Sequence, residues 1–427
     1  MSYNLLYRSF VGLGADEAVP DDTTLVVFRQ RIGEEGVRKV FSLLNRRWEV
    51  AGLIGKDRRV VDGVHIWARV ARRGWAEAMR CGRELVVEAV EAVDGELGSK
   101  LRGEFVSAQK GQEHAGDEAI CLELELCEKL LEAVAGIEDG RVRQRAEILR
   151  RMMAEKDRPV SFDDVDARWG HKRQGEVFLG YKLHEAIDPD SRMVTAVDVV
   201  PGNVNEAVRT GELLGKESVP AEEGGVVIGD GLYNNSTTVG QVKACGKRPC
   251  FSGLSSERVS DDFDYDAEAD CVVCAEGKRS VGKVRVDAGD LYYFSMKDCK
   301  GCRRRKECLT VGERFGKAQP RRRVYISDVR KEKLVAGEAG RSWRREHLRV
   351  RGRIEAKFSE QVNRHGLRRA RYWGLAKVTV QVLLNVITVN LKRAARLIGR
   401  GWRVGLRAGC GPPVPSGVLA ITQEVAC

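Results

Sequence analysis

The chain has 427 residues, 43% of them hydrophobic, and its 73 Lys and Arg residues outnumber its 62 Asp and Glu residues. This length and composition exclude an intrinsically disordered chain and a membrane protein, and they allow two or three domains with a large core. The net charge of +11 favours a polyanionic partner such as nucleic acid. Twelve cysteines, and a start (MSYNLLYRSF) without the features of a secretory signal, favour a cytosolic chain whose thiols are reduced or bind metal.

The first clear pattern is helical and covers residues 21–56. It opens with Asp and Thr residues suited to an N-cap, and Gly33 and Gly36 are expected to break it. Its apolar residues recur at helical spacing: Val26, Phe28, Ile32, Val37, Val40, Phe41 and Leu44. We expect a small helical module here.

A strand is predicted next, in RRVVDGVHIWARV (58–70), and it carries Asp62. The Glu-, Arg-, Ala- and Leu-rich stretch that follows predicts a helical insertion at 70–155. Two strand-like runs around a Pro-Asp-Ser turn then predict a hairpin over 178–200. The segment EAVRTGELLG (206–215) predicts a helix.

The stretch GGVVIGDGLYNN (224–235) predicts a short buried strand that ends at Asp230. An Asp after a strand is usually a turn residue, so a catalytic role requires other carboxylates nearby. A later basic helix, 349–374, supplies Glu355, and an apolar buried helix is predicted over 378–391. This order of elements predicts a ribonuclease H-like fold, a mixed sheet flanked by helices, with two aspartates at adjacent strand ends and the glutamate on the late helix.

Several of these stretches, in this order, resemble the DDE transposases of bacterial insertion sequences. The resemblance is to the group with a helical N-terminal domain before a ribonuclease H-like catalytic domain, and it covers roughly two-thirds of the chain. It rests on residues 23–54, VVDGVHI (60–66), 164–206, VVIGDGLY (226–233) and 353–393.

The resemblance implies that Asp62, Asp230 and Glu355 bind Mg²⁺ or Mn²⁺. Two such ions roughly 3.5–4 Å apart can activate the attacking oxygen and relieve charge on the leaving oxygen of a phosphodiester. The chain departs from many relatives at three positions: Val64 replaces a Thr or Ser, Gly231 a Lys or Ala, and Val362 a Lys that contacts DNA. All three acids are present, which favours an intact active site.

The cysteines form a second pattern, with Cys271, Cys274, Cys299 and Cys302 arranged as C-x2-C…C-x2-C. This pattern matches a tetrahedral zinc site, although its spacer of 24 residues is a little longer than usual, and Cys308 could replace one of the four. The alternative is a reduced, cysteine-rich loop without metal. We expect a zinc-ribbon-like insertion over 241–318.

Positive charge is concentrated in residues 341–372, which hold eleven Lys and Arg residues against three Glu. This excess is far from a balanced solvated helix face, and it favours contact with the DNA backbone. The expected contacts are Arg351, Arg353, Arg368 and Arg371.

We therefore predict a transposase that cuts at the ends of its own insertion sequence and joins them to target DNA. Its partners would be double-stranded DNA, as terminal inverted repeats and target, and further copies of itself in a synaptic complex, in the cytoplasm at the nucleoid. Two alternatives stay open: an inactive zinc-containing DNA-binding protein derived from a transposase, and a stand-alone nuclease. The expected domains are a helical DNA-binding domain (1–56), the catalytic domain in two parts (57–240 and 319–400), the cysteine-rich insertion between them (241–318) and a tail (401–427).

Overall fold

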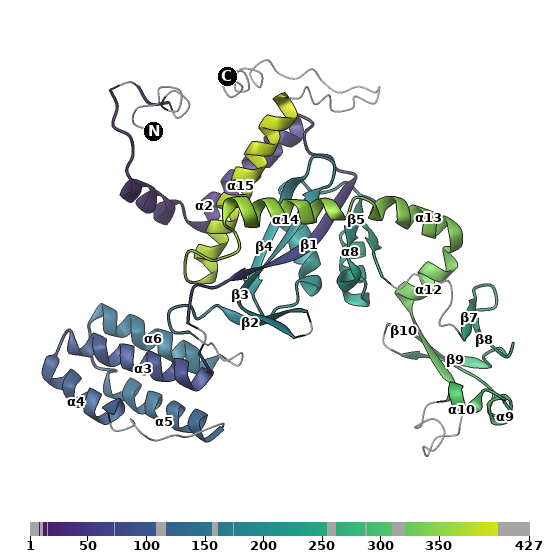
Figure 1. Ribbon diagram of the computed structural model, residues 1–427, viewed down its shortest axis with the longest axis horizontal. Coiled ribbons are helices and arrows are strands. Elements are labelled where there is room, and N and C mark those ends of the chain that lie inside the picture. The colour runs from purple at the N-terminus through teal and green to yellow at the C-terminus, as the bar shows by residue number, and fades with distance from the viewer. Residues whose placement is uncertain are drawn as a thin grey trace.

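The computed structural model of the protein describes residues 8, 12–14, 16–71, 73–107, 117–155, 161–173, 175–253, 262–286, 288–309 and 321–399. The predicted tail, 401–427, lies outside these ranges. The described residues form a mixed α/β structure in which helices cover a mixed sheet (Figure 1). The fold class predicted from the sequence is confirmed at this level.

Six strands form the central sheet. They are β1 (Arg58–Trp67), β2 (Arg168–Arg173), β3 (Glu176–Asp188), β4 (Met193–Pro201), β5 (Val226–Gly229) and β6 (Arg248–Phe251). The order is β2-β3-β1-β5-β6, and β4 pairs with the later part of β3. β1 is antiparallel to β3 and parallel to β5, and β5 is parallel to β6. β3 and β4 form the predicted hairpin.

Helices bury both faces of this sheet. The core on one face joins β1, β3 and β4 to α2, α14 and α15, and the core on the other face joins them to α7 and α8. These helices span Asp22–Val50, Gly352–His365, Leu375–Gly399, Thr210–Gly215 and Ser236–Ala244. Because both faces are covered, β3 and β4 are almost continuously buried, and their sequences lack the alternation of a half-exposed strand.

The first helix, α2, follows the predicted cap and break. The Asp21 carboxylate accepts a hydrogen bond from the Thr24 N–H at 2.7 Å, which satisfies one free donor of the first turn. Gly33 has a φ of 58°, a left-handed conformation that glycine adopts without a Cβ clash, and it kinks the helix. The predicted break at Gly36 is absent, because the helix continues through this residue.

The predicted apolar helix, α15, is longer than the stretch 378–391 and spans 25 residues. Its length and composition alone would allow it to cross a membrane. It packs, however, against α2 and β4. Its buried Asn390 accepts a hydrogen bond from the Val194 N–H at 2.9 Å and donates one to the Val194 carbonyl at 2.8 Å. These contacts make α15 a buried helix packed against one face of the sheet, as predicted.

Four helices between β1 and β2 form a separate bundle, which lies to one side of the sheet in Figure 1. They are α3 (Trp75–Glu91), α4 (Gly95–Phe105), α5 (Asp117–Ala133) and α6 (Gly140–Ala154). Their apolar side chains, among them Val86, Leu130 and Leu149, form a core distinct from those of the sheet. Within the bundle, Arg83 and Glu123 form a buried ion pair at 2.8 Å.

A second peripheral unit follows β6, on the other side of the sheet (Figure 1). It contains a two-stranded sheet, β7 and β8, and a three-stranded sheet in the order β11-β10-β9. These strands span Phe263–Asp266, Cys271–Cys274, Gly282–Val286, Gly289–Tyr293 and Arg323–Ser327, with short helices α9 (Met296–Lys300) and α10 (Arg305–Cys308) before β11. Two helices, α12 (Asp328–Val335) and α13 (Gly337–Leu348), then lead back to α14.

Candidate active site

Asp62 and Asp230 lie at the same level of two neighbouring parallel strands. β1 and β5 pair with Val60 beside Ile228, and each aspartate is two residues further along its chain. Asp62 accepts a hydrogen bond from the Gly63 N–H at 2.8 Å. Asp230 comes directly after β5 and caps the 3-10 helix η3 (Gly231–Tyr233), accepting from the Leu232 N–H at 2.8 Å. Local backbone donors therefore orient both half-buried carboxyl groups.

The third predicted acid, Glu355, comes from α14, which packs against β1. It lies in the first turn of this helix, and its side chain is 56% exposed. Its carboxylate forms an ion pair with Arg351, one turn earlier, at 2.8 Å. Glu355 therefore faces solvent and already has a cationic partner.

The electrostatics of Asp62 show that the three acids influence one another. Burial raises the pKa of Asp62 to about 7, and the charges of Asp230 and Glu355 also raise it. The Gly63 N–H and the Arg351 guanidinium act in the opposite direction. A carboxyl group whose negative charge is disfavoured by burial and by like charges gains most from a bound cation.

A buried acid that the sequence reasoning missed lies directly across from Asp62. Glu185 of β3 is its antiparallel partner, is fully buried, and accepts a hydrogen bond from the Gln361 amide of α14 at 2.7 Å. Burial raises the pKa of Glu185 to about 7. A lone carboxylate inside the apolar run FLGYKLHEAI was the available signal. This contact fastens α14, the helix that carries Glu355, to β3, the neighbour of the strand that carries Asp62.

A second set of residues that was not predicted from the sequence lies around Tyr233. This tyrosine is buried, and its hydroxyl lacks a hydrogen-bond partner among the described residues. Burial raises the pKa of Tyr233 well above its usual value, with further rises from the charges of Asp62, Glu206 and Asp230. Glu206 forms an ion pair with Lys182 at 2.8 Å. A Cβ atom at position 63 would lie 3.0 Å from the Glu206 side chain, so a glycine next to Asp62 leaves room for this acid.

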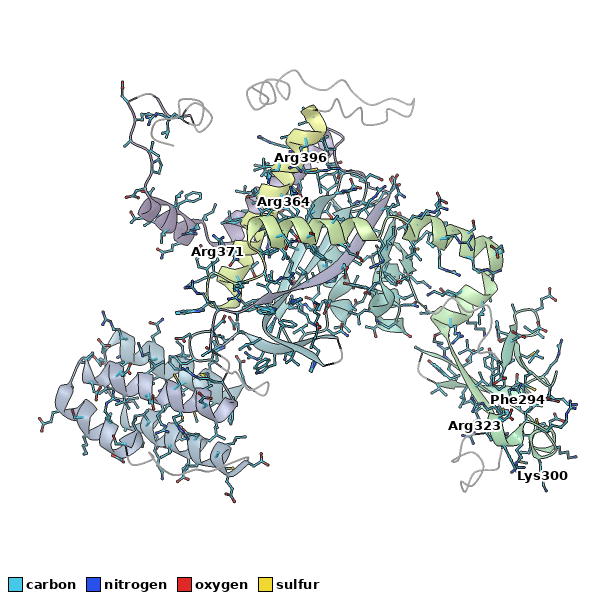
Figure 2. All side chains as sticks on the ribbon, viewed as in Figure 1. Phe294, Lys300, Arg323, Arg364, Arg371 and Arg396 are labelled. Carbon is cyan, nitrogen blue, oxygen red and sulfur yellow. The ribbon has the colours of Figure 1, made fainter. Side chains whose placement is uncertain are left out.

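The four predicted DNA-contacting arginines have different surroundings. Arg351 pairs with Glu355, and Arg353 with Asp190 at 2.7 Å. Arg368 lies 3.1 Å from the ring of His65, whose pKa is lowered to about 4 by burial and by nearby positive charges. Arg371 is exposed and has no ion-pair partner among the described residues. Figure 2 shows Arg371 with Arg364 and Arg396 beside α14 and α15.

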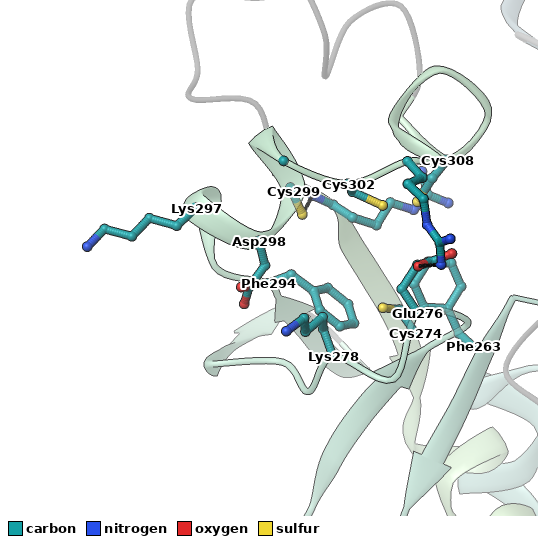
Figure 3. Close-up of a pocket in the computed structure, with 13 residues that line it drawn as sticks. Phe263, Cys274, Glu276, Lys278, Phe294, Lys297, Asp298, Cys299, Cys302 and Cys308 are labelled. Carbon is teal, nitrogen blue, oxygen red and sulfur yellow. Dashed lines mark hydrogen bonds and ion pairs between the residues drawn. The ribbon is translucent and has the colours of Figure 1, made fainter.

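The structure brings four cysteines to one cavity of about 330 Å³ in the peripheral strand unit: Cys274, Cys299, Cys302 and Cys308 (Figure 3). Cys271, one of the four expected zinc ligands, does not line this cavity, and Cys308 does. Among the described residues, no group of three or more His, Cys, Asp or Glu side chains is arranged to hold a metal ion as it stands.

Two segments of the chain match models of known protein families. Residues 151–253, which include β2 to β6 and Asp230, match a family model described as "Transposase DDE domain", and residues 273–395, which include Glu355, match a second model of the same description. The chain belongs to the DDE transposases. Asp62 lies outside both matched segments.

No curated protein and no solved structure matches this chain. Membership of the DDE transposases implies a DNA substrate and a nuclease or strand-transfer activity, which such domains generally carry out with Mg²⁺ or Mn²⁺. The residues that perform this chemistry are assigned below on the geometry of this chain.

Proposed function

We propose that this transposase cuts DNA at the ends of its own insertion sequence and joins them to target DNA, with Asp62, Asp230 and Glu355 as its catalytic acids. One observation carries the proposal. Two aspartates occupy the same level of adjoining parallel strands, and a glutamate on the helix packed over β1 lies within electrostatic reach of them.

The residue types fit a hard divalent cation, because carboxylate oxygens are the protein ligands that Mg²⁺ prefers. Asp62, Asp230 and Glu355 would hold it, and when bound it would activate the attacking oxygen and neutralise the leaving oxygen of the phosphodiester. Glu355 must first exchange its ion pair with Arg351 for the cation. The raised pKa of Asp62 means that this carboxyl group also gives up a proton.

The rest of the site positions these acids. The N–H groups of Gly63 and Leu232 hold Asp62 and Asp230 in place, and the Glu185–Gln361 hydrogen bond fixes α14 on the sheet. Once Arg351 leaves Glu355, its guanidinium is available for a phosphate oxygen of the DNA.

The strand order supports the finer fold assignment, a ribonuclease H-like catalytic domain. A hairpin antiparallel to β1, with β5 and β6 parallel to β1 on its other side, places the two aspartates at the centre of the sheet. The α3–α6 bundle and the cysteine-bearing unit then interrupt this domain at two connections.

The wider setting follows from the same proposal. The DNA would be the terminal inverted repeats and the target, and the helical module at 21–56 would position the repeat. Pairing of two ends requires an oligomer, and four apolar residues on the first half of α2 are exposed and suited to a protein contact: Leu25, Val26, Val27 and Phe28. The enzyme would act in the cytoplasm, at the nucleoid.

The test is cleavage of DNA carrying the element's ends, with Mg²⁺, by Asp230→Asn, Asp62→Asn and Glu355→Gln. Each change preserves size and removes one negative charge. We expect cleavage to fall by several orders of magnitude, with double variants little worse than single ones, because the acids act as one unit. Binding of end DNA should persist.

The matched control is Asp190→Asn, a half-exposed acid in the β3–β4 turn that pairs with Arg353. It should cut DNA like the wild type. Wild-type cleavage by Asp230→Asn would instead show that Asp230 is only a turn residue.

A further inference from the structure

The cysteine-lined cavity lies outside the catalytic site and has a chemistry of its own. Three structural elements contribute its thiols: Cys274 ends β8, Cys299 lies in α9, and Cys308 ends α10, with Cys302 between the two helices. All four thiols are partly buried and unoxidised. Figure 3 shows their sulfur atoms around one space.

The backbone of β8 explains why Cys271 is absent from this set. Cys271 and Cys274 are the first and last residues of a four-residue strand. Side chains three positions apart on a strand point to opposite faces, so this pair cannot converge on one ion as the cysteines of a C-x2-C turn can. After Cys274 the chain does turn, because the Gly277 N–H donates to the Cys274 carbonyl at 2.8 Å and Gly277 has a φ of 70°.

The four thiols line one cavity and are close neighbours of one another (Figure 3). The Arg322 N–H donates to the Cys299 sulfur at 3.5 Å, a backbone contact that stabilises a thiolate. Two cationic residues, Lys278 and Arg322, also line the cavity.

This part of the chain has a small hydrophobic core. Among the described residues this core is formed by Phe263, Val272, Tyr292, Phe294, Val324 and Ile326, and Cys274, Cys299 and Cys308 pack at its edge. A unit with so few buried side chains generally needs a disulfide or a structural metal for stability. The thiols lie where such a link would join the β7–β8 hairpin to the segment before β11.

We propose that Cys274, Cys299, Cys302 and Cys308 form a structural Zn²⁺ site that fastens the β7–β8 hairpin to α9 and α10. Four thiolates make a closed tetrahedral set, which selects Zn²⁺ over the hard cations of the catalytic site. Binding requires the four side chains to rotate inward from their present positions around the cavity. Bound zinc removes the repulsion between neighbouring thiolates.

The experiment measures metal in full-length protein purified under reducing conditions. We expect about one zinc per chain, and cobalt substitution should give the visible absorption of a tetrahedral thiolate site. Replacing Cys274, Cys299, Cys302 or Cys308 with Ser should each abolish stoichiometric zinc. The matched control Cys271→Ser, on the same strand as Cys274, should keep it.

Three outcomes would overturn the assignment: no zinc in the reduced wild-type protein, stoichiometric iron in its place, or equal loss of zinc from Cys271→Ser and Cys274→Ser. The wild-type measurement does not depend on whether any variant folds. Asp62→Asn should retain full zinc, so failure of the proposed active site and failure of this site are distinguishable.

Discussion

Arg351, the residue before α14, and Glu355, in the first turn of α14, form an ion pair at 2.8 Å beside the strand that carries Asp62. The Arg351 guanidinium also lowers the pKa of Asp62. It therefore serves as counterion to two of the proposed metal ligands. A cation entering this site must compete with an arginine that already neutralises part of the negative charge.

Replacing Arg351 with Ala should therefore strengthen metal binding in the absence of DNA. A half-exposed ion pair contributes about 0.3–1 kcal/mol, which corresponds to about a two- to five-fold lower dissociation constant for Mn²⁺. Calorimetric titration of the DNA-free protein measures this. The control is Arg353→Ala, on the same helix but paired with Asp190. Equal metal affinities in the two variants would show that Arg351 does not compete with the metal.

The raised pKa of Asp62, about 7, predicts that metal binding depends on pH. The carboxyl group must lose its proton to become a ligand, so Mg²⁺ affinity should rise as the pH increases from about 6 to about 8, with release of a proton. Asp62→Asn should remove this dependence along with most of the affinity. A metal affinity that stays flat across this range would contradict the raised pKa.

Without metal, the Asp62 carboxyl group should make the fold less stable as the pH rises, whereas metal affinity rises with pH. Its folded-state pKa lies above the unfolded value, so its stabilising contribution is complete below about pH 4 and is lost as the pH rises through about 7. The pKa of Glu185 is also raised to about 7 by burial, so its contribution to stability is lost over the same pH range. Thermal unfolding in a chelating buffer should show this loss of stability, reduced in part by either Asp62→Asn or Glu185→Gln.

The buried pair Arg83–Glu123 should control the stability of the α3–α6 bundle. Both side chains are almost fully buried, so Glu123→Ala leaves an unpaired guanidinium in the core, at a cost of about 3–5 kcal/mol. Hydrogen exchange should accelerate in α3–α6, while the central sheet, which has separate cores, stays protected. The control Glu125→Ala, two residues along α5 in an exposed pair with Lys129, should change little.

Much of the fold could be predicted because local sequence signals and tertiary packing agree. The apolar run ending at Asp230 is β5, the Pro-Asp-Ser turn joins β3 to β4, and Gly33 kinks α2. Gly36 shows the limit of such signals, since α2 continues through this glycine at a modest cost in helix propensity.

The site was harder to predict where partners are distant in sequence. Glu185 lies on a strand buried on both faces, so no alternation marks its direction, and its partner Gln361 is 176 residues away. The cysteine spacing predicts that Cys271 and Cys274 bind one metal ion together. Both lie on the strand β8, where side chains three positions apart point to opposite faces. Cys308 was a possible substitute from the sequence, and the fold shows that Cys271 is the residue it replaces at the cavity.

Arg371 offers the clearest test of DNA contact by the basic segment. It is exposed and has no ion-pair partner among the described residues. An unpaired guanidinium in this strongly basic segment should contact phosphates rather than bases. Arg371→Ala should therefore weaken binding to end DNA and random DNA alike, and reduce the slope of log affinity against log salt concentration by about one.

The control is Arg353→Ala. It removes a guanidinium that already pairs with the Asp190 carboxylate and donates to the Pro189 carbonyl, so the salt slope of DNA binding should change less in this variant. Fluorescence anisotropy over a salt series measures both. A loss confined to the terminal repeat would show that Arg371 reads bases, because backbone contact cannot distinguish one sequence from another.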